Sequence, residues 1–480
     1  MSQNPIPPSV AIAGGGLAGL AAACVLADSG LRVTLLERRP YLGGRASSYE
    51  HPGTGEVVDN CQHVLFRVCT NLIEFYRRIG VEDKILWYDD MTFIEPGGRS
   101  SVLHASPLPA PLHTAPSFLR FPFLTVRDKR AIARAIASLT LTAQPNTGKS
   151  FLQWCRDHDQ TENAIECFWK PILVSALSEH LDLISVSYAA QVVRESMKSP
   201  AARHMGVPSI PLTDLYNQAG EYIRTRGGEI LLRTSLQTFS SNSSGVQIRI
   251  TDQDKKEREA SFDYLILALP FNTVEDVLPQ TPAAAPLRED LTHFESCPIT
   301  GIHLWFDRQI TDLDHAVLLD RTIQWMFHKS RLLTTRTVAG SEPAGSYIEL
   351  VVSASKSLID KSRPEIVDLA LKEVREFFPA ARDAVLLKSA VIKEVHATYS
   401  PRPGIDAHRP PQSTAWPRVF LAGDWTATGW PATMEGAVRS GYLAAETLVR
   451  TAGIGASEME NKKFLAPDLP ASGFMRLFRP

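Results

Sequence analysis

Short apolar runs and a helical stretch alternate at the start of the chain. Residues 9–13 are almost all apolar and predict a strand, residues 14–19 predict a glycine-rich turn, and residues 17–29 predict a helix. Residues 31–36 form a second apolar run, which ends at Glu37. A strand, a glycine turn, a helix and a second strand are typical of the start of a doubly wound parallel sheet.

Further apolar runs indicate where this sheet continues later in the chain. Strands are predicted within residues 227–250, at residues 264–269 and at residues 419–422. The last two are continuous apolar runs, as expected of parallel strands that are buried on both faces. A helix is predicted from about Met434 to Thr447.

The intervening segments have a different pattern, which indicates a second domain. Helical periodicity predicts helices at residues 71–79, 127–139 and 161–177. Strands are predicted at residues 300–306 and 346–352. The chain is therefore expected to combine a parallel α/β domain with an α+β domain.

Composition and charge exclude several classes of protein. Basic residues number 50 and acidic residues 52, a formal net charge of −2, so there is no electrostatic footprint for nucleic acid. The six cysteines show no CxxC pair and no metal-ligand spacing, so we expect no metal site and reduced thiols, as in the cytoplasm. Residues 10–26 lack a preceding basic segment and contain three consecutive glycines, so neither a secretory signal nor a membrane span is expected.

The first turn carries the pattern GxGxxG, in Gly14, Gly16 and Gly19. The first glycine permits the tight turn, the second lets the backbone approach a diphosphate, and the third lets the helix and strand pack closely. The phosphates are then expected at the helix N-terminus, around Leu17 and Ala18. A glycine-rich turn of an unrelated fold is the alternative, but the strand before the motif and the helix after it favour a dinucleotide site.

An acidic residue and a second pair of glycines follow. Glu37 lies 23 positions after Gly14, a spacing that suits a carboxylate binding the ribose hydroxyls of a dinucleotide. Gly43-Gly44-Arg45 indicates a backbone that passes close to the same diphosphate, with Arg45 as the counter-charge. The alternative is a surface loop with a solvated arginine.

Together these segments resemble the signature of the flavin amine oxidase and phytoene desaturase superfamily. The resemblance rests on residues 11–19, on Glu37-Arg38, on Gly43-Gly44-Arg45 and on a second motif, Gly423-Asp424, before the last helix, and it covers most of residues 10–449. It implies non-covalent FAD in a discontinuous Rossmann-like domain with an inserted α+β substrate domain. The expected boundaries are residues 8–75, 200–280 and 405–452 for the FAD domain, 76–199 and 281–404 for the substrate domain, and 453–480 for a C-terminal tail.

Other segments are similar to one branch of this superfamily, the squalene-associated desaturase-like flavoproteins. They are residues 58–63, 301–307, 324–327 and 423–441. This branch includes the hydroxysqualene dehydroxylases of hopanoid biosynthesis, and the similarity implies reductive removal of the hydroxyl of hydroxysqualene to give squalene, with an electron donor that the sequence does not indicate. A carotenoid or phytoene desaturase and another flavin amine oxidase are alternatives. A non-catalytic prenyl-lipid carrier is an alternative of another class, against which the intact dinucleotide motifs count.

The resemblance also implies which residues contact the cofactor. It places Leu236 near the adenine, Asp424 near the ribitol or diphosphate, Met434 at the helix that faces the pyrimidine edge, and the segment with Gln62 and His63 beside the isoalloxazine. The expected cofactor-binding residues are Gly14, Gly16, Leu17, Ala18, Gly19, Glu37, Arg38, Gly44, Arg45, Gln62, His63, Leu236, Gly423, Asp424 and Met434.

Catalytic residues are harder to predict. His63 and Glu435 are candidate proton donors, and a buried histidine bound by backbone is the alternative for His63. An amine oxidase is expected to have a lysine near the flavin, but the predicted strand context of Lys329 does not match that position. Trp425 and Trp430 are predicted to form either an aromatic cage for an ammonium or the wall of a hydrocarbon channel.

Two segments mix apolar and basic residues, as interfacial elements do. In residues 107–124 the apolar members are Leu112, Phe118, Leu119, Phe121, Phe123 and Leu124, and in residues 474–479 Phe474, Met475, Leu477 and Phe478 alternate with Arg476 and Arg479. A buried loop and a packed tail are the alternatives. We expect peripheral contact with the inner face of the membrane, where a long apolar isoprenoid substrate would reside.

Overall fold

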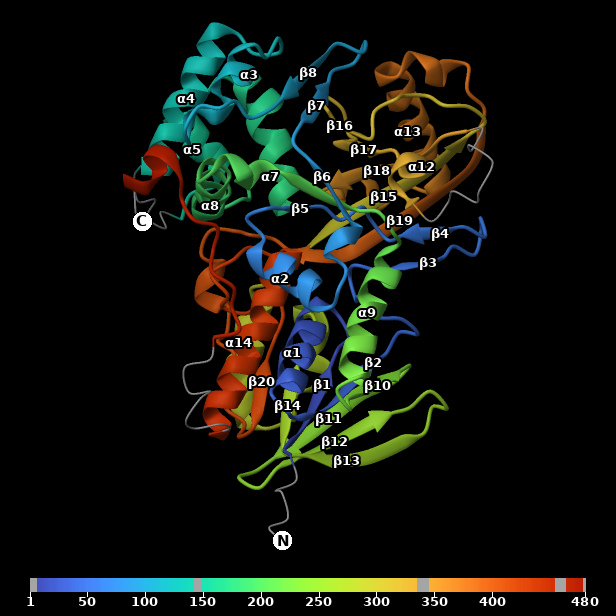
Figure 1. The fold of residues 1–480 in the computed structure, drawn as a ribbon, viewed down its shortest axis with the longest axis vertical. Helices are drawn as coiled ribbons and strands as arrows, with labels where there is room; N and C mark the ends of the chain where they lie inside the picture. The colour runs from blue at the N-terminus through green and yellow to red at the C-terminus, as the bar shows by residue number, and fades with distance from the viewer. Residues whose placement is uncertain (1–6, 142–147, 335–344, 454–462, 478–480) are drawn as a thin grey trace.

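The computed structural model describes residues 7–141, 148–334, 345–453 and 463–477 (Figure 1). A five-stranded parallel sheet, which we call the nucleotide sheet, forms the lower part of the molecule in this view. In spatial order its strands are β10 (Glu229–Leu232), β2 (Arg32–Glu37), β1 (Ser9–Ala13), β14 (Tyr264–Leu267) and β20 (Val419–Leu421). The strands come from the beginning, middle and end of the chain.

Both faces of the nucleotide sheet are buried. Val10 and Ile12 face a core that contains helices α1 (Leu17–Asp28), α9 (Leu212–Arg224) and α14 (Met434–Ala452). Ala11 and Ala13 belong to a second core, which also contains residues of the three-stranded antiparallel sheet β11 (Ser235–Ser241), β12 (Val246–Thr251) and β13 (Glu257–Phe262). Burial on both sides explains why the strands read as continuous apolar runs rather than alternating patterns.

A seven-stranded sheet, which we call the substrate sheet, forms the upper right of Figure 1. In spatial order its strands are β19 (Leu386–Tyr399), β15 (Ser296–Phe306), β18 (Tyr347–Ser353), β17 (Trp325–Phe327), β16 (His315–Leu318), β7 (Met91–Ile94) and β8 (Ser100–Leu103). Helix α13 (Arg363–Phe377) covers one face, where Ile302 and Leu350 meet Ala370. Trp325, Phe327 and Val351 belong to the core on the other side.

A group of helices lies beside the substrate sheet, at the upper left of Figure 1. Its members are α3 (Ala115–Leu119), α4 (Val126–Leu141), α5 (Phe151–Asp157), α6 (Glu162–Ala164), α7 (Lys170–Leu177) and α8 (Val186–Met197). The helix predicted over residues 161–177 contains a π-helical turn, Ile165–Trp169, between α6 and α7. Pro171 lies just after this turn and has no N–H to donate, so the regular hydrogen-bond ladder is interrupted there.

Short elements connect these layers. They are helices α2 (Thr70–Arg78), α10 (Phe271–Val274), α11 (Ala285–Thr292) and α12 (Lys329–Leu332), the strand pair β3 (Ser48–Glu50) and β4 (Val57–Asp59), and the sheet β5 (Leu65–Phe66), β9 (Met205–Pro208) and β6 (Ile85–Tyr88). Within the described ranges, none of the helices combines the length and the apolar character needed to cross a membrane. The predicted α/β fold, with a second α+β part, is confirmed.

Candidate active site

One cavity of about 1210 Å³ joins the nucleotide sheet to the substrate sheet and the helices. Its nucleotide end is lined by backbone and side chains that follow β1, β2, β14 and β20, where parallel α/β sheets bind ligands. Its other end, which we call the apolar arm, is lined by residues of the substrate sheet and of helices α3, α4, α7 and α8. Every cofactor-binding residue predicted from the sequence lies on this wall except Gly19, which shapes the turn from behind.

The turn between β1 and α1 can only be built from glycines at two positions. A Cβ at Gly14, whose φ is +111°, would lie 2.4 Å from the carbonyl oxygen of Ala268, and a Cβ at Gly19 would lie 1.9 Å from the carbonyl oxygen of Gly14. Gly16 is the N-cap of α1 and, among the described residues, no side chain caps this end. The first N–H groups of α1 are therefore left for a ligand, and the turn fits a dinucleotide diphosphate.

Glu37 is fixed at the end of β2 by backbone donors. Its Oε2 accepts from the N–H of Gly15 and its Oε1 from the N–H of Arg39, each at 2.7 Å. The side chain of Arg39 donates to the carbonyl oxygen of Gly44 at 2.7 Å, so it ties the two glycine segments together. A carboxylate has about four acceptor positions, so Glu37 keeps capacity for ribose hydroxyls. Arg39 was not predicted from the sequence as a site residue, while the predicted Arg38 is exposed on the cavity wall.

Arg45 and Asp424 connect the two ends of the chain across the site. Their side chains form an ion pair of 2.6 Å between residues 379 positions apart, and Arg45 also donates to the carbonyl oxygen of Ala397 on β19 at 3.0 Å. Asp424 is buried, whereas Arg45 keeps about a quarter of its side chain exposed (27%). The sequence therefore predicted both residues at this site but not their pairing.

His63 lies on the cavity wall, but its hydrogen bond does not suit a proton donor. Its Nδ1 is 2.7 Å from the carbonyl oxygen of Cys61, and because a carbonyl only accepts, this nitrogen carries the hydrogen. Burial lowers the pKa of His63, so the ring is neutral near pH 7. The other ring nitrogen then has a lone pair and no proton to give.

The carboxylate of Glu435 is held by hydrogen bonds to the neighbouring helix α2. Its carboxylate is fully buried and accepts from the side chain of Asn71 at 2.9 Å and from the N–H of Leu72 at 2.8 Å. These are donors of the first turn of α2, whose own N-cap, Cys69, makes no capping hydrogen bond. Burial raises the pKa of Glu435. Glu435 lines the cavity, but its carboxylate is engaged by these donors, and we interpret it as a cap that joins α14 to α2.

Most of the remaining predicted residues line the cavity. Leu236 and Met434 line it, and the hydroxyl of Tyr216 donates to the sulfur of Met434 at 3.6 Å. Trp430 also lines it, but Trp425 does not: its ring is fully buried and donates to the carbonyl oxygen of Leu269 at 2.9 Å. A cage made by Trp425 and Trp430 is therefore excluded, because the cavity meets only one of the two rings.

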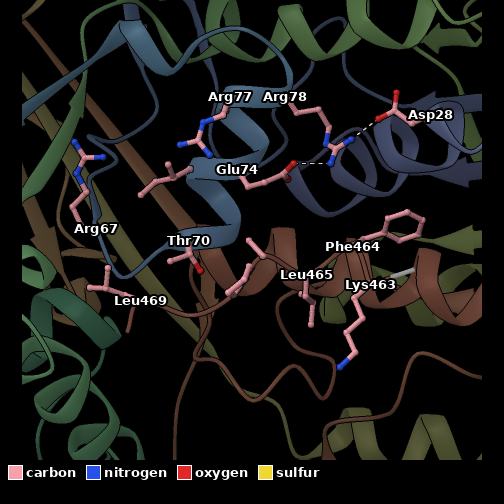
Figure 2. A pocket seen from close by; sticks show the side chains of 13 residues that line it. Asp28, Arg67, Thr70, Glu74, Arg77, Arg78, Lys463, Phe464, Leu465 and Leu469 are labelled. Atoms are coloured by element: carbon pink, nitrogen blue, oxygen red, sulfur yellow. Dashed lines mark hydrogen bonds and ion pairs between the residues drawn. The ribbon is translucent and has the colours of Figure 1, made fainter. Parts of the chain in front are cut away.

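A second hollow, of about 620 Å³, lies between α2 and residues 463–469 (Figure 2). Arg78 points from α2 toward Asp28 and Glu74 and pairs with both, as the dashed lines show. The N–H of Ala466 donates to the side chain of Asn71 at 2.8 Å, which fastens the C-terminal segment to α2. Because its charged residues are largely engaged in such contacts, we assign this hollow to the packing of the C-terminal segment.

The glycine turn, the fixed carboxylate and the continuous cavity together define a dinucleotide-dependent oxidoreductase. The family model for flavin containing amine oxidoreductase matches residues 17–449, and the chain belongs to this family. FAD is thus the cofactor, and the uncapped start of α1 and the glycine cradle fit it. Among the described residues, no group of three or more His, Cys, Asp or Glu side chains could hold a metal ion.

The chain is similar in sequence to carotenoid desaturases and similar in fold to amine oxidases. The chain is 28% identical to 15-cis-phytoene desaturase of Synechococcus elongatus over 92% of this chain and 95% of that protein. It is 27% identical to a probable zeta-carotene desaturase of the same organism, over 93% and 100%. Among solved structures, putrescine oxidase bound to putrescine has a TM-score of 0.68 at 17% identity, covering 92% of this chain and 99% of that one. Cyclohexylamine oxidase from Brevibacterium oxydans has a TM-score of 0.64 at 17% identity, covering 93% and 99%.

Proposed function

We propose that this chain uses reduced FAD to remove the hydroxyl of hydroxysqualene and so makes squalene. The main observation in favour of a long apolar substrate is that one cavity runs continuously from the glycine turn to the apolar arm. Phe118, Ile136 and Phe168 line this arm, and such walls suit an isoprenoid chain better than a small amine. The similarity of residues 423–441 to squalene-associated flavoproteins supports the particular substrate.

A carotenoid-type desaturase is the second candidate, since the curated relatives include phytoene and zeta-carotene desaturases. The two reactions run in opposite directions, so the state of the flavin separates them. Hydroxysqualene and phytoene are each offered without oxygen to reduced and to oxidised enzyme, and the products are identified by mass spectrometry. Squalene from the reduced enzyme supports the proposal, and desaturated phytoene from the oxidised enzyme contradicts it. A protein purified without flavin absorbance and unable to bind FAD would instead be a carrier.

The protein's own residues bind the cofactor, orient the substrate and exclude water. FAD, when bound and reduced, supplies the hydride that replaces the hydroxyl. The start of α1 and Glu37 hold the dinucleotide, the apolar arm orients the isoprenoid, and its walls keep bulk water from the reacting carbon. The hydroxyl leaves as water only after it receives a proton, so the wall must also offer an acid.

Glu195 on α8 is a better candidate for this acid than His63 or Glu435. It is half-buried on the cavity wall, and burial raises its pKa even though Lys198 lies 3.1 Å away. Replacing Glu195 by Gln removes the proton while keeping the size, so turnover should fall by about 100-fold or more with FAD binding unchanged. The test is single-turnover kinetics beside FAD titration, with the exposed Glu221→Gln as control. Undiminished turnover would assign the acid elsewhere.

We also propose that the mouth of the apolar arm contacts a lipid bilayer. Leu112 lines the cavity and is 48% exposed, and Leu119, Phe474 and Leu477 are exposed as well. The N–H of Phe474 donates to the carbonyl oxygen of Ala110 at 2.9 Å, so the C-terminal segment lies against residues 107–114. We call these four exposed side chains the apolar rim. With the exposed Arg120 and Arg476 nearby in sequence, the apolar rim has the composition of an interfacial element.

The expectation for residues 107–124 needs a correction. Phe121, Phe123 and Leu124 are buried in the core, where Phe121 packs edge-on against Phe93. Met475 in the tail is also buried. These side chains are therefore unavailable to a membrane, and the predicted residues Phe478 and Arg479 lie outside the described residues.

A further inference from the structure

Lys329, whose predicted strand context does not match the lysine of an amine oxidase, lies fully buried. It is the first residue of α12, directly after β17, and its side chain is 1% exposed. Its ammonium is 2.6 Å from Oδ2 of Asp59 and 2.8 Å from Oε1 of Gln62. A buried ammonium is stable only when it is paired and hydrogen-bonded, and these two residues meet that requirement.

Asp59 connects this lysine to the nucleotide side. Its other oxygen accepts from the hydroxyl of Ser48 at 2.6 Å and from the N–H of Leu212, at the start of α9, at 3.2 Å. Burial alone would raise the pKa of Asp59, but the ammonium of Lys329 holds this pKa below its usual value. The carboxylate is therefore charged, and it forms the junction between α12 and α9.

Glu349 on β18 completes the cluster. It is fully buried, lies 3.5 Å from the ammonium of Lys329, and its carboxyl accepts no hydrogen bond of normal geometry from the described residues. Burial raises the pKa of Glu349 to about 8, which favours the protonated form at pH 7. The charged pair of the cluster is thus Lys329 with Asp59.

The segment that follows Asp59 is held against the substrate sheet and lines the cavity. The side chain of Asn60 donates to the carbonyl oxygen of Arg45 at 2.8 Å and accepts from the N–H of Ser47 at 3.2 Å. A Cβ at Gly301 on β15 would lie 3.1 Å from the carbonyl oxygen of Asn60, so the sheet touches this backbone closely. Asn60, Cys61, Gln62 and His63 all face the cavity.

We propose that Lys329 is a positioning residue, which grips Asp59 and Gln62 from the substrate side and so fixes the segment 60–63 against the flavin ring. It rests on FAD as the cofactor and on the position beside this segment that the family resemblance implies for the ring, and it does not depend on which isoprenoid is the substrate. Gln62 lines the cavity whereas Lys329 does not, so Lys329 acts through the residues that it binds.

The test uses the FAD-loaded protein and the double variant Lys329→Met with Asp59→Asn. The two substitutions together leave no unpaired buried charge, so the variant should fold. We expect the FAD dissociation constant to change by less than about threefold, because the dinucleotide end keeps its contacts, while the visible absorbance and circular dichroism of the flavin and its reduction potential shift. Flavin bands and a potential equal to those of the wild type, in the folded double variant, would overturn the proposal.

Two matched variants separate positioning from stability. Lys356→Met breaks another ion pair with a buried carboxylate, because Lys356, whose side chain is 36% exposed, contacts the fully buried Glu179 at 2.7 Å. The hydrogen bonds of this pair among the described residues do not reach the segment 60–63. This substitution should lower the melting temperature without moving the flavin bands. Glu349→Gln keeps the Lys329–Asp59 pair and should leave bands and potential unchanged at pH 7. These readouts need no substrate, so a failure of the proposed dehydroxylation would not be mistaken for a failure of this inference. Equal band shifts in Lys356→Met would also overturn it.

Discussion

The nucleotide end and the apolar arm share one cavity but are built by different means. At the nucleotide end, backbone groups of short segments, such as the glycine turn after β1, form much of the surface, and side chains such as Glu37 have fixed partners. The apolar arm takes one to a few side chains from each of several helices and strands. Directional contacts allow little change, whereas apolar packing depends mainly on volume. Function at the two ends should therefore fail in different ways.

Acid should have the largest effect, and it should act on the substrate side. His113, His303, His315 and His328 are buried there, and each has a ring nitrogen without a hydrogen-bond partner among the described residues. Burial lowers the pKa of His113, His315 and His328 from 6.5 to about 4, and that of His303 to about 3.

The direction of the pH dependence of folding stability follows from these pKa values. Between pH 6.5 and 4 the unfolded chain binds more protons than the folded chain, so stability is complete above pH 6.5 and is lost as the pH falls toward 4. The loss should reach several kcal/mol, at about 1.4 kcal/mol per unit of pKa shift for each histidine. Melting curves from pH 7 to pH 4.5 measure it. His328→Gln should flatten the slope, while the exposed His180→Gln should not, and equal slopes would refute this origin.

Gly19→Ala tests the rigidity of the nucleotide end. The new Cβ would lie 1.9 Å from a backbone oxygen, so the turn must shift and the FAD dissociation constant should rise by more than about 100-fold, or roughly 3 kcal/mol. Fluorescence titration measures this. Gly220→Ala in α9 is the matched control, because its Cβ would meet only the ends of flexible side chains at 3.0 Å or more. Wild-type affinity in Gly19→Ala would show that the turn adapts and that the contrast between the two ends is smaller than proposed.

The same contrast decides what the sequence could predict. The strand–turn–helix at residues 9–29 and the residues Gly14, Gly16 and Glu37 were identified because neighbours in sequence make the structure there. The pairing of Arg45 with Asp424, the capping of α2 by Glu435 and the burial of Lys329 join residues that lie 270 to 379 positions apart. Local pattern carries no information on such contacts. The prediction that Phe121 and Phe123 contact a membrane was wrong for a related reason. An apolar run has the same pattern whether the protein core or a membrane covers it.

Ala176→Phe tests the apolar arm. Ala176 on α7 is half-buried and lines the cavity, so a phenyl ring there should obstruct an isoprenoid but not the dinucleotide. We expect KM for the C30 substrate to rise about tenfold, about 1.4 kcal/mol, with an unchanged FAD dissociation constant. The half-buried Ala452→Phe, outside the cavity, is the control. A loss of FAD binding in Ala176→Phe would mean that the two ends are coupled and cannot be perturbed separately.

The smallest effect on turnover should come from the apolar rim, which affects only the delivery of substrate. Leu477 is 77% exposed and Phe474 51%, so changing both to Ser removes apolar surface without opening the core, in contrast to truncation, which would also remove the buried Met475. Each side chain contributes about 1–3 kcal/mol when buried in an apolar phase, so partition onto anionic liposomes should fall about tenfold or more. Flotation measures this, and a thermal melt should show no change.

The same variant should slow turnover on membrane-held substrate a few-fold, while turnover on detergent-solubilised substrate stays at the wild-type rate. The exposed pair Val385→Ser and Leu387→Ser, at the start of the edge strand β19 of the substrate sheet, is the control for generic hydrophobicity. If both pairs reduce flotation equally, or if the rim variant floats like the wild type, the membrane surface lies elsewhere, and the arm must receive its substrate from a soluble carrier or from another opening.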